Sequence, residues 1–274
     1  MRRAYKGGWA IGAFNTSNLE TSQAIIEAAE ELRAPVIIQT TEKAIGYAGV
    51  DVLSGMVKTL AARAHVPVIL NLDHGRSLQI AQIAARHGYT ALMIDGSKLP
   101  FKKNLSITRA VVKVARAYGI GAEGELGTIG GVEDFIHHKS ILMTEPEDAQ
   151  LFVRQTGVDI LAVAFGSSHG LPVKGEHLDF TRLAQIRKAI PGVPLVFHGA
   201  SSTRKDFIKK AIRLGVCKIN IDTDIREAFS TALRKKLASD TKVYDTRDIL
   251  SYAREAVKNV VKEKIRMFGS AHKA

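Results

Sequence analysis

Asp73 and His74 are adjacent residues whose types and position point to chemistry. They follow an apolar run at residues 66–72, which has the length and composition of a buried parallel strand, and Gly75 then lets the chain turn. Because α/β folds build their sites at the carboxyl ends of strands, a carboxylate and an imidazole placed there indicate catalysis or ligand binding more than packing.

Two further histidines, His169 and His198, are also followed by glycine at the predicted end of a strand. Three imidazoles from separate strands can occupy three corners of a zinc tetrahedron and leave the fourth open for a substrate. The spacing of the three residues matches no metal-binding motif, and a single histidine in such a place is more often an ordinary hydrogen-bonded residue. The residues alone therefore leave both a zinc site and a structural role open.

Acidic and hydroxyl side chains stand at the remaining predicted strand ends. Asp95 ends one strand, and Glu123 and Glu125 end another. Residues 199–203, Gly-Ala-Ser-Ser-Thr, precede a predicted helix and can hold an anion through N–H groups, hydroxyls and the positive end of that helix. Residues 220–224, Asn-Ile-Asp-Thr-Asp, open the next helix and add donors. Ordinary helix capping is the alternative explanation for both segments.

Strand-like apolar runs alternate with helix-like stretches along the whole chain. The predicted strands lie at residues 9–14, 35–40, 67–72, 91–95, 121–126, 159–165, 194–198 and 216–221. The predicted helices lie at about residues 18–33, 50–64, 77–88, 103–118, from 146 onwards, 180–190, 203–214 and 223–239. Eight such units without a linker predict a single α/β domain over residues 1–274, a (β/α)8 TIM barrel with a C-terminal helical extension at about 246–268. A doubly wound sheet is the alternative, but it seldom needs eight regular units.

The net charge of +12 is spread over many of the predicted helices. We interpret most of this charge as a solvated surface, which could also steer anionic metabolites, above all phosphates. Nucleic acid is disfavoured because no basic tail and no aromatic platform accompanies the basic residues. The single cysteine, Cys217, rules out an intramolecular disulfide and fits a reducing cytoplasm. No apolar run approaches the length of a membrane span, so we expect neither nucleic acid nor a membrane as a partner.

Six segments together resemble the class II, metal-dependent fructose-bisphosphate aldolase family, including its tagatose-bisphosphate branch. The segments are Leu72-Asp-His-Gly75, Met93-Ile-Asp-Gly-Ser97, Glu125-Leu-Gly-Thr-Ile-Gly-Gly-Val-Glu-Asp134, Ala164-Phe-Gly-Ser-Ser-His-Gly170, Phe197-His-Gly-Ala-Ser201 and Lys218-Ile-Asn-Ile-Asp-Thr223. The resemblance spans nearly the whole chain, from Ala13 to Gly269. The segments are specific as a set, although each alone would be weak.

This resemblance implies a zinc site. His74, His169 and His198 would be the ligands of a catalytic Zn2+, and Asp95 and Glu125 would support the site or hold the metal in an alternative position. As a Lewis acid, the zinc ion would bind the ketone and the adjacent hydroxyl oxygen of the substrate and stabilise negative charge there, so that no Schiff-base lysine is needed.

The resemblance also implies roles at the substrate. Asp73 would exchange a proton with the C4 oxygen during carbon–carbon cleavage, and Glu133, on a glycine-rich loop, would move the proton at C1 of dihydroxyacetone phosphate. The implied substrate-binding residues are Asn15, Gly170, Gly199, Ala200, Ser201, Asn220, Ile221, Asp222, Thr223 and Arg254. A monovalent cation, Na+ or K+, would belong to the phosphate site. Arg254 would grip the distal phosphate from a neighbouring subunit of a homodimer or homotetramer.

The implied reaction is the reversible cleavage of fructose 1,6-bisphosphate to dihydroxyacetone phosphate and glyceraldehyde 3-phosphate, a step of glycolysis and gluconeogenesis in the cytoplasm. Tagatose 1,6-bisphosphate is the close alternative. A non-metal phosphate-binding barrel, such as an isomerase, and a basic nucleic-acid-binding module are alternatives of other classes.

The sequence departs from the family pattern at two places. Gly124 stands where the family usually has a bulkier residue, and Ser-Tyr-Ala at residues 251–253 replaces the Gly and Pro common before Arg254. We expect Gly124 to have a small effect on packing near Glu125. Lys218, inside a predicted strand, is expected to turn away from the site.

Overall fold

Eight parallel strands close into a barrel, as the sequence predicts. They are β1 (Ile11–Asn15), β2 (Val36–Thr41), β3 (Val68–Gly75), β4 (Ala91–Ile94), β5 (Gly121–Leu126), β8 (Ile160–Val163), β10 (Leu195–Phe197) and β11 (Val216–Ile221). Their order around the barrel is β1-β11-β10-β8-β5-β4-β3-β2. The computed structural model describes residues 1–274 except 129, 134–135, 139–141, 170–177 and 202, and it describes no side chains at 130–138 and 168–169.

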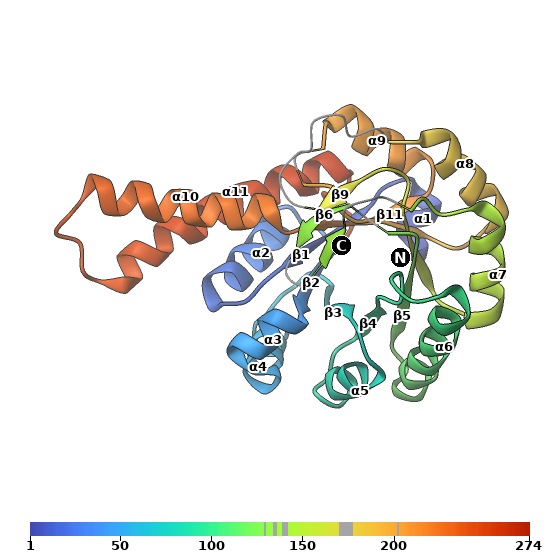
Figure 1. Cartoon of the computed structure of the whole chain (residues 1–274). Coiled ribbons are helices and arrows are strands. Elements are labelled where there is room, and N and C mark those ends of the chain that lie inside the picture. The colour runs from blue at the N-terminus through green and yellow to red at the C-terminus, as the bar shows by residue number, and fades with distance from the viewer. Residues whose placement is uncertain (129, 134–135, 139–141, 170–177, 202) are drawn as a thin grey trace.

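Helices cover the outside of the barrel (Figure 1). They include α2 (Leu19–Glu31), α4 (Val50–Ala61), α5 (Leu78–Arg86), α6 (Phe101–Tyr118), α7 (Pro146–Thr156), α8 (Phe180–Ala189) and α9 (Lys205–Arg213). Asn18 and Ser77 cap α2 and α5 through their side chains, and Gly119 ends α6 with a φ of 67°. Two short helices, α1 (Arg2–Gly7) and α3 (Glu42–Ala48), escape the sequence prediction because they are too short to show a helical period.

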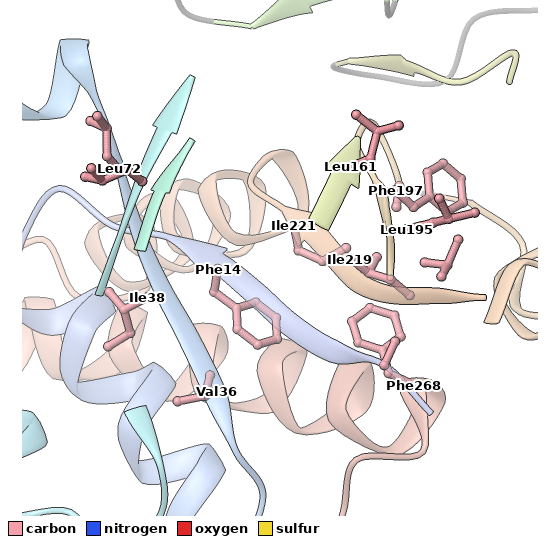
Figure 2. Packing of buried hydrophobic residues seen from close by; sticks show 14 of the residues in the cluster. Phe14, Val36, Ile38, Leu72, Leu161, Leu195, Phe197, Ile219, Ile221 and Phe268 are labelled. Atoms are coloured by element: carbon pink, nitrogen blue, oxygen red, sulfur yellow. The ribbon is translucent and has the colours of Figure 1, made fainter. Parts of the chain in front are cut away.

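The last two helices, α10 (Thr223–Ser239) and α11 (Thr246–Phe268), form an arm that reaches beyond the barrel (Figure 1). Helix α11 returns along α10 and α2, and its end contacts β1. Phe268 is buried there near Phe14 and Ile219 (Figure 2), and its carbonyl accepts a hydrogen bond from Ala10 N–H at 3.1 Å. The C-terminal end of the extension predicted at 246–268 therefore packs on the outside of the barrel beside β1.

The strands alternate between an apolar outer face and a polar interior near their carboxyl ends. Phe14 and Ile38 point outward into the core under the helices (Figure 2). The pairing register sets Asn15 beside Gln39, and Gln39 beside Asn71. The side chain of Gln39 donates to Asn15 Oδ1 at 2.7 Å and accepts from Asn71 Nδ2 at 3.3 Å. A row of buried amides thus lines the barrel just below its carboxyl end.

A small second sheet occupies the long connections after β5 and β8. It consists of β6 (Gly130–Glu133), β7 (Ile136–His138) and β9 (Ser168–His169), in the order β7-β6-β9. The sequence predicts loops here, and the structure differs because β6 and β7 pair as an antiparallel hairpin that β9 joins in parallel. Figure 1 shows β6 and β9 side by side.

Gly124 is required by the packing behind β5. A Cβ atom at this position would lie 2.8 Å from Phe152 and 3.2 Å from Val158. Phe152 is fully buried, so the ring occupies the space that a larger residue at position 124 would need. The ring of Phe152 on α7 thus fills the space that the bulkier residue common in the family would need at position 124.

Among the described residues, no helix is both long and apolar enough to cross a membrane.

Candidate active site

The end of β3 is irregular, and this irregularity lets two successive side chains face the barrel interior. The register between β3 and β4 shifts between Leu72 and Gly75, and His74 has a φ of 48° in the left-handed region. In a regular strand, the side chains of Asp73 and His74 would point to opposite faces. A non-glycine residue in this region costs of order 1–2 kcal/mol, and such strain clusters at functional sites.

The imidazoles of His74 and His198 converge at the carboxyl end of the barrel. Nε2 of His74 lies 3.0 Å from Nδ1 of His198, with the two rings nearly perpendicular at 78°. Each outer ring nitrogen faces a carboxylate: His198 Nε2 lies 3.0 Å from Glu123, and His74 Nδ1 lies 3.3 Å from Asp95. Because carboxylates accept hydrogen bonds, the outer nitrogens carry N–H, and in the neutral rings the inner nitrogens present lone pairs to each other. Two lone pairs at that distance need a cation between them, either a proton or a metal ion.

His198 is held neutral in a fully buried setting. Burial lowers the pKa of His198 to about 4, although the hydrogen bond with Glu123 acts in the opposite direction. Burial would raise the pKa of Glu123, but the charge of Lys218 and the contact with His198 hold it at about 2. The Lys218 ammonium lies 2.7 Å from Glu123 Oε2. A neutral imidazole beside an ionised carboxylate is the form of histidine that binds metals.

His74 stands among acidic groups. Burial lowers its pKa, but the charges of Asp73, Asp95 and Glu125 raise that pKa well above the ordinary value. Burial raises the pKa of Asp95, but the contact with His74 and two hydrogen bonds from Ser97, at 3.0 and 2.6 Å, lower it overall. Burial and the neighbouring carboxylates raise the pKa of Glu125 well above its usual range.

The Asp73 carboxylate is held by two amides. Asn15 Nδ2 donates to Asp73 Oδ2 at 2.9 Å, and Asn220 Nδ2 donates to Oδ1 at 3.2 Å. The hydrogen bond from Gln39 Nε2 to the side-chain oxygen Oδ1 of Asn15 orients the Asn15 side-chain amide with its NH2 group toward Asp73. Asp73 is 1% exposed, so its orientation is set by these donors and not by water.

The arrangement fits a metal ion. Two groups of side chains could hold a metal ion, and the possible ligand atoms within each group lie within 4.8 Å of one another. The groups are Asp73, His74 and His198, and His74, Asp95 and Glu125. Two nitrogens bound to one tetrahedral zinc ion are about 3.3 Å apart, close to the separation of the two imidazoles. In the described part of the chain, Glu125 Oε2 accepts no hydrogen bond although His74 Nδ1 lies 3.7 Å away. A cation bound at this place would satisfy that buried acceptor.

Three predicted site residues fall on the small sheet or beside it. Gly131 of β6 pairs with His169 of β9, so the strand that carries Glu133 runs next to His169. The side chains of Glu133 and His169 and all of Gly170 lie outside the described part of the structure. Their roles as base, metal ligand and phosphate contact stay predictions.

The predicted anion-binding segments follow β10 and β11. Gly199 has a left-handed φ of 67°, Ala200 is buried and accepts a turn hydrogen bond from Thr203 N–H at 3.1 Å, and Ser201 is half-buried. Helix α9 begins at Lys205, later than the predicted start at residue 203. Gly199, Ala200 and Ser201 therefore follow His198 directly and precede the helix.

At the end of β11, Asn220 faces the interior, whereas Ile221 is buried in the apolar core. Thr223 opens α10. The Asp222 carboxylate makes no capping hydrogen bond; it accepts from Arg226 Nε at 2.7 Å. Ordinary capping therefore does not explain Asp222.

Arg254 contacts α2 in its own chain. Its Nη1 donates to Gln23 at 3.0 Å and its Nε donates to Glu27 at 3.3 Å, and the side chain is 35% exposed. Nothing in a single chain tests whether Arg254 reaches the substrate of a neighbouring subunit, so that role stays a prediction.

Lys218 points into the barrel, and the expectation that it turns away is wrong. Lys218 and Asn220 are two residues apart on β11 and share one face of the strand, as their bonds to Glu123 and Asp73 show. The same rule places Glu123 on the inner face with Glu125. Strand alternation alone could have found both residues, whereas the role of Glu123 at His198 depends on the barrel.

A cavity of about 410 Å³ opens beside the buried site formed by Asp73, His74 and His198. Its lining includes Asn15, Thr41, Lys43, Asp222 and Arg226. Asn15 joins the cavity to the buried cluster, because it also donates to Asp73. The cavity offers hydroxyl, amide and cationic groups to the far end of a polar ligand.

Fold and site together define an enzyme of the (β/α)8 barrel class whose strand ends form a histidine–carboxylate site suited to a metal ion. Comparisons with known proteins narrow this class. The family described as "Fructose-bisphosphate aldolase class-II" matches residues 1–273. The chain therefore belongs to the class II fructose-bisphosphate aldolase family, whose members are metal-dependent lyases.

Relatives within the family carry different names. A fructose-bisphosphate aldolase of Thermus caldophilus is 43% identical, with 100% of this chain and 97% of the relative covered. A sulfofructosephosphate aldolase of Alkalicoccus urumqiensis is 40% identical, with 100% and 96% covered. The crystal structure of the YdjI aldolase from Escherichia coli K12 superposes with a TM-score of 0.88 at 36% identity, with 99% and 95% covered. Family membership thus fixes the reaction type but not the sugar.

Proposed function

We propose that this protein is a zinc-dependent aldolase that reversibly cleaves fructose 1,6-bisphosphate to dihydroxyacetone phosphate and glyceraldehyde 3-phosphate. The observation that carries the proposal is the convergence of His74 Nε2 and His198 Nδ1, 3.0 Å apart, beside the oriented Asp73 carboxylate. Metal and proton carrier are then next to each other, as aldol cleavage requires.

His74 and His198 would hold the metal, with His169 as the third ligand. A bound zinc ion supplies Lewis-acid stabilisation of negative charge at the substrate carbonyl. Asp95 and Glu125 support the site through Nδ1 of His74, at 3.3 and 3.7 Å. Their carboxylates also offer the alternative metal position that the second ligand group describes.

Asp73 would take the proton of the C4 hydroxyl in the cleavage direction and return it in the synthesis direction. The two amide donors fix its carboxylate toward one place in the interior, which favours proton exchange at one substrate atom. Glu133 would move the proton at C1 of dihydroxyacetone phosphate, and its position on the small sheet next to the strand of His169 supports that role.

The phosphate of dihydroxyacetone phosphate would be held by the segments after β10 and β11. The residues proposed for it are Gly170, Gly199, Ala200, Ser201, Asn220, Ile221, Asp222 and Thr223. The (β/α)8 fold commonly binds phosphate at this place, and a monovalent cation, Na+ or K+, would belong to the same phosphate site.

The cavity beside Asn15 would take the other end of the sugar. Lys43 on its lining, with Arg226 paired to Asp222 beside it, favours an anionic end group, either a phosphate or the sulfonate of the sulfofructosephosphate that names one relative. Arg254 of a neighbouring subunit, in a homodimer or homotetramer, would complete this subsite. A cytoplasmic location belongs to the same proposal.

The decisive experiment compares kcat/KM of the zinc-reconstituted protein on fructose 1,6-bisphosphate, tagatose 1,6-bisphosphate and sulfofructose phosphate. We expect fructose 1,6-bisphosphate to be the best substrate. A higher kcat/KM on either other sugar would replace the proposed substrate and leave the aldolase reaction in place. Isomerisation of a sugar phosphate without bound metal would favour the non-metal barrel.

A further inference from the structure

A buried ion pair crosses the interior of the barrel beneath His198. Glu123 comes from β5 and Lys218 from β11, and these strands are separated in the barrel by β8 and β10. The Lys218 ammonium lies 2.7 Å from Glu123 Oε2, with the two side chains 1% and 2% exposed. The pair has no part in the proton transfers or in the phosphate contacts proposed above.

Stability does not explain the pair. Desolvation of two charges usually cancels their attraction, and a well-packed apolar pair of similar volume would serve the fold equally well. An apolar side chain at position 218 would have apolar neighbours, because Val196 and Ile11 are the register partners of Lys218 on the two neighbouring strands. The two charges therefore point to a task at the site.

The second oxygen of Glu123 shows that task. Glu123 Oε1 lies 3.0 Å from His198 Nε2, while Oε2 is occupied by Lys218. One carboxylate thus contacts the ring nitrogen that faces away from His74. A carboxylate has only acceptors, so its contact selects the tautomer of His198 with N–H at Nε2 and a lone pair at Nδ1.

We infer that Glu123 is a positioning residue that holds the His198 ring with Nδ1 directed at the metal site, and that Lys218 acts through Glu123 by balancing its buried charge. Asn220 Nδ2 lies 3.2 and 3.4 Å from the two ring nitrogens of His198 and offers no acceptor to either of them. Without Glu123, the tautomer with N–H at Nε2 loses its acceptor, and a change of tautomer would remove the Nδ1 lone pair from its place opposite His74 Nε2. Loss of the carboxylate that accepts a hydrogen bond from a metal-binding histidine typically lowers metal affinity about 10- to 100-fold. The inference rests on the proposed metal site.

Two double variants separate the acceptor from the charge. Glu123→Gln with Lys218→Met keeps a carbonyl acceptor for His198 Nε2, whereas Glu123→Leu with Lys218→Met removes it. In both variants positions 123 and 218 carry no charge, so neither variant leaves an unpaired buried ion. Gln and Leu at position 123 are also close in volume. The probes are Zn2+, titrated in competition with a chromophoric chelator, and Co2+, whose visible spectrum reports ligand geometry.

We expect the Gln/Met variant to bind Zn2+ within about threefold of the natural protein and the Leu/Met variant to bind about 10- to 100-fold more weakly, with an altered Co2+ spectrum. Equal Zn2+ affinities in the two variants would overturn the role of Glu123. Lys218→Met alone should lower the urea midpoint of unfolding, and an unchanged midpoint would overturn the charge-balancing role of Lys218. If the natural protein bound no Zn2+, the proposed function would fail first, and the inference with it.

Discussion

Replacing Asp73 by Ala tests whether, at the end of β3, Asp73 carries a proton while His74 binds the metal. The carboxylate is 1% exposed and accepts from Asn15 at 2.9 Å and from Asn220 at 3.2 Å. If Asp73 carries the proton of the C4 hydroxyl, its removal takes away general acid–base catalysis, which contributes about 10²- to 10⁴-fold, or about 3–5 kcal/mol of the activation barrier.

The substitution also affects stability, and a matched variant controls for this. Asp73→Ala leaves two buried amide donors without their acceptor, at about 1–3 kcal/mol each unless water enters. Asp73→Asn keeps the shape and one carbonyl acceptor, so it should lose less stability while losing the same proton chemistry. Urea unfolding of both variants gives the stability difference separately from the rate.

The assay combines turnover with zinc content. We expect kcat for fructose 1,6-bisphosphate cleavage to fall about 10²- to 10⁴-fold in both variants while one zinc ion per chain is retained. Near-normal turnover of Asp73→Ala would refute the role of Asp73 as proton carrier. Loss of zinc in both variants would instead make Asp73 a metal ligand, which the ligand group of Asp73, His74 and His198 allows geometrically.

Three further predictions concern the base, the pH dependence and the packing. Glu133→Ala should abolish the exchange of the C1 proton of dihydroxyacetone phosphate with solvent, measured by NMR in deuterium oxide, whereas Asp73→Ala should keep it; normal exchange in Glu133→Ala would exclude Glu133 as the base. Burial raises the pKa of Tyr89 to about 12, despite its 2.6 Å hydrogen bond with Thr40. The unfolded chain therefore ionises first as pH rises, and the natural protein should lose up to about 2.7 kcal/mol relative to Tyr89→Phe between pH 10 and 12; parallel losses in both proteins would contradict this. Gly124→Ala should destabilise by about 1–3 kcal/mol because its Cβ would lie 2.8 Å from Phe152, and Phe152→Leu in the same chain should relieve part of the cost in urea unfolding; additive losses would show that the ring is not the obstacle.

The barrel was predictable from the sequence because most of its strands are short apolar runs followed by polar residues. The end of β11 shows why: Ile219 and Ile221 are buried in the apolar core on either side of Asn220, which faces the interior, and the next residues open a helix. The second sheet was not predictable in this way. Its strands are as short as two residues, and β6 gains its partner β9 from a segment far along the chain, so no local period marks it.

The candidate site was predictable in its residues but not in its contacts. Asp73 and His74 were identified by position, yet regular alternation would send them to opposite faces, and only the register shift at the end of β3 brings both inside. The contact between Glu123 and His198 joins residues 75 positions apart, and closure of the barrel alone creates it. Metal-site geometry of this kind is a property of the tertiary fold.

The measurement that tests the account most directly is the cleavage of fructose 1,6-bisphosphate by the protein before and after removal of its metal. We expect exhaustive chelation to abolish cleavage, stoichiometric Zn2+ to restore it, and borohydride with substrate to leave it unaffected, because no lysine forms a Schiff base in the proposed reaction. His198→Ala should then recover neither zinc nor activity. Cleavage that survives complete metal removal, or that borohydride abolishes in the presence of substrate, would contradict the assignment of His74 and His198 as ligands of a catalytic metal.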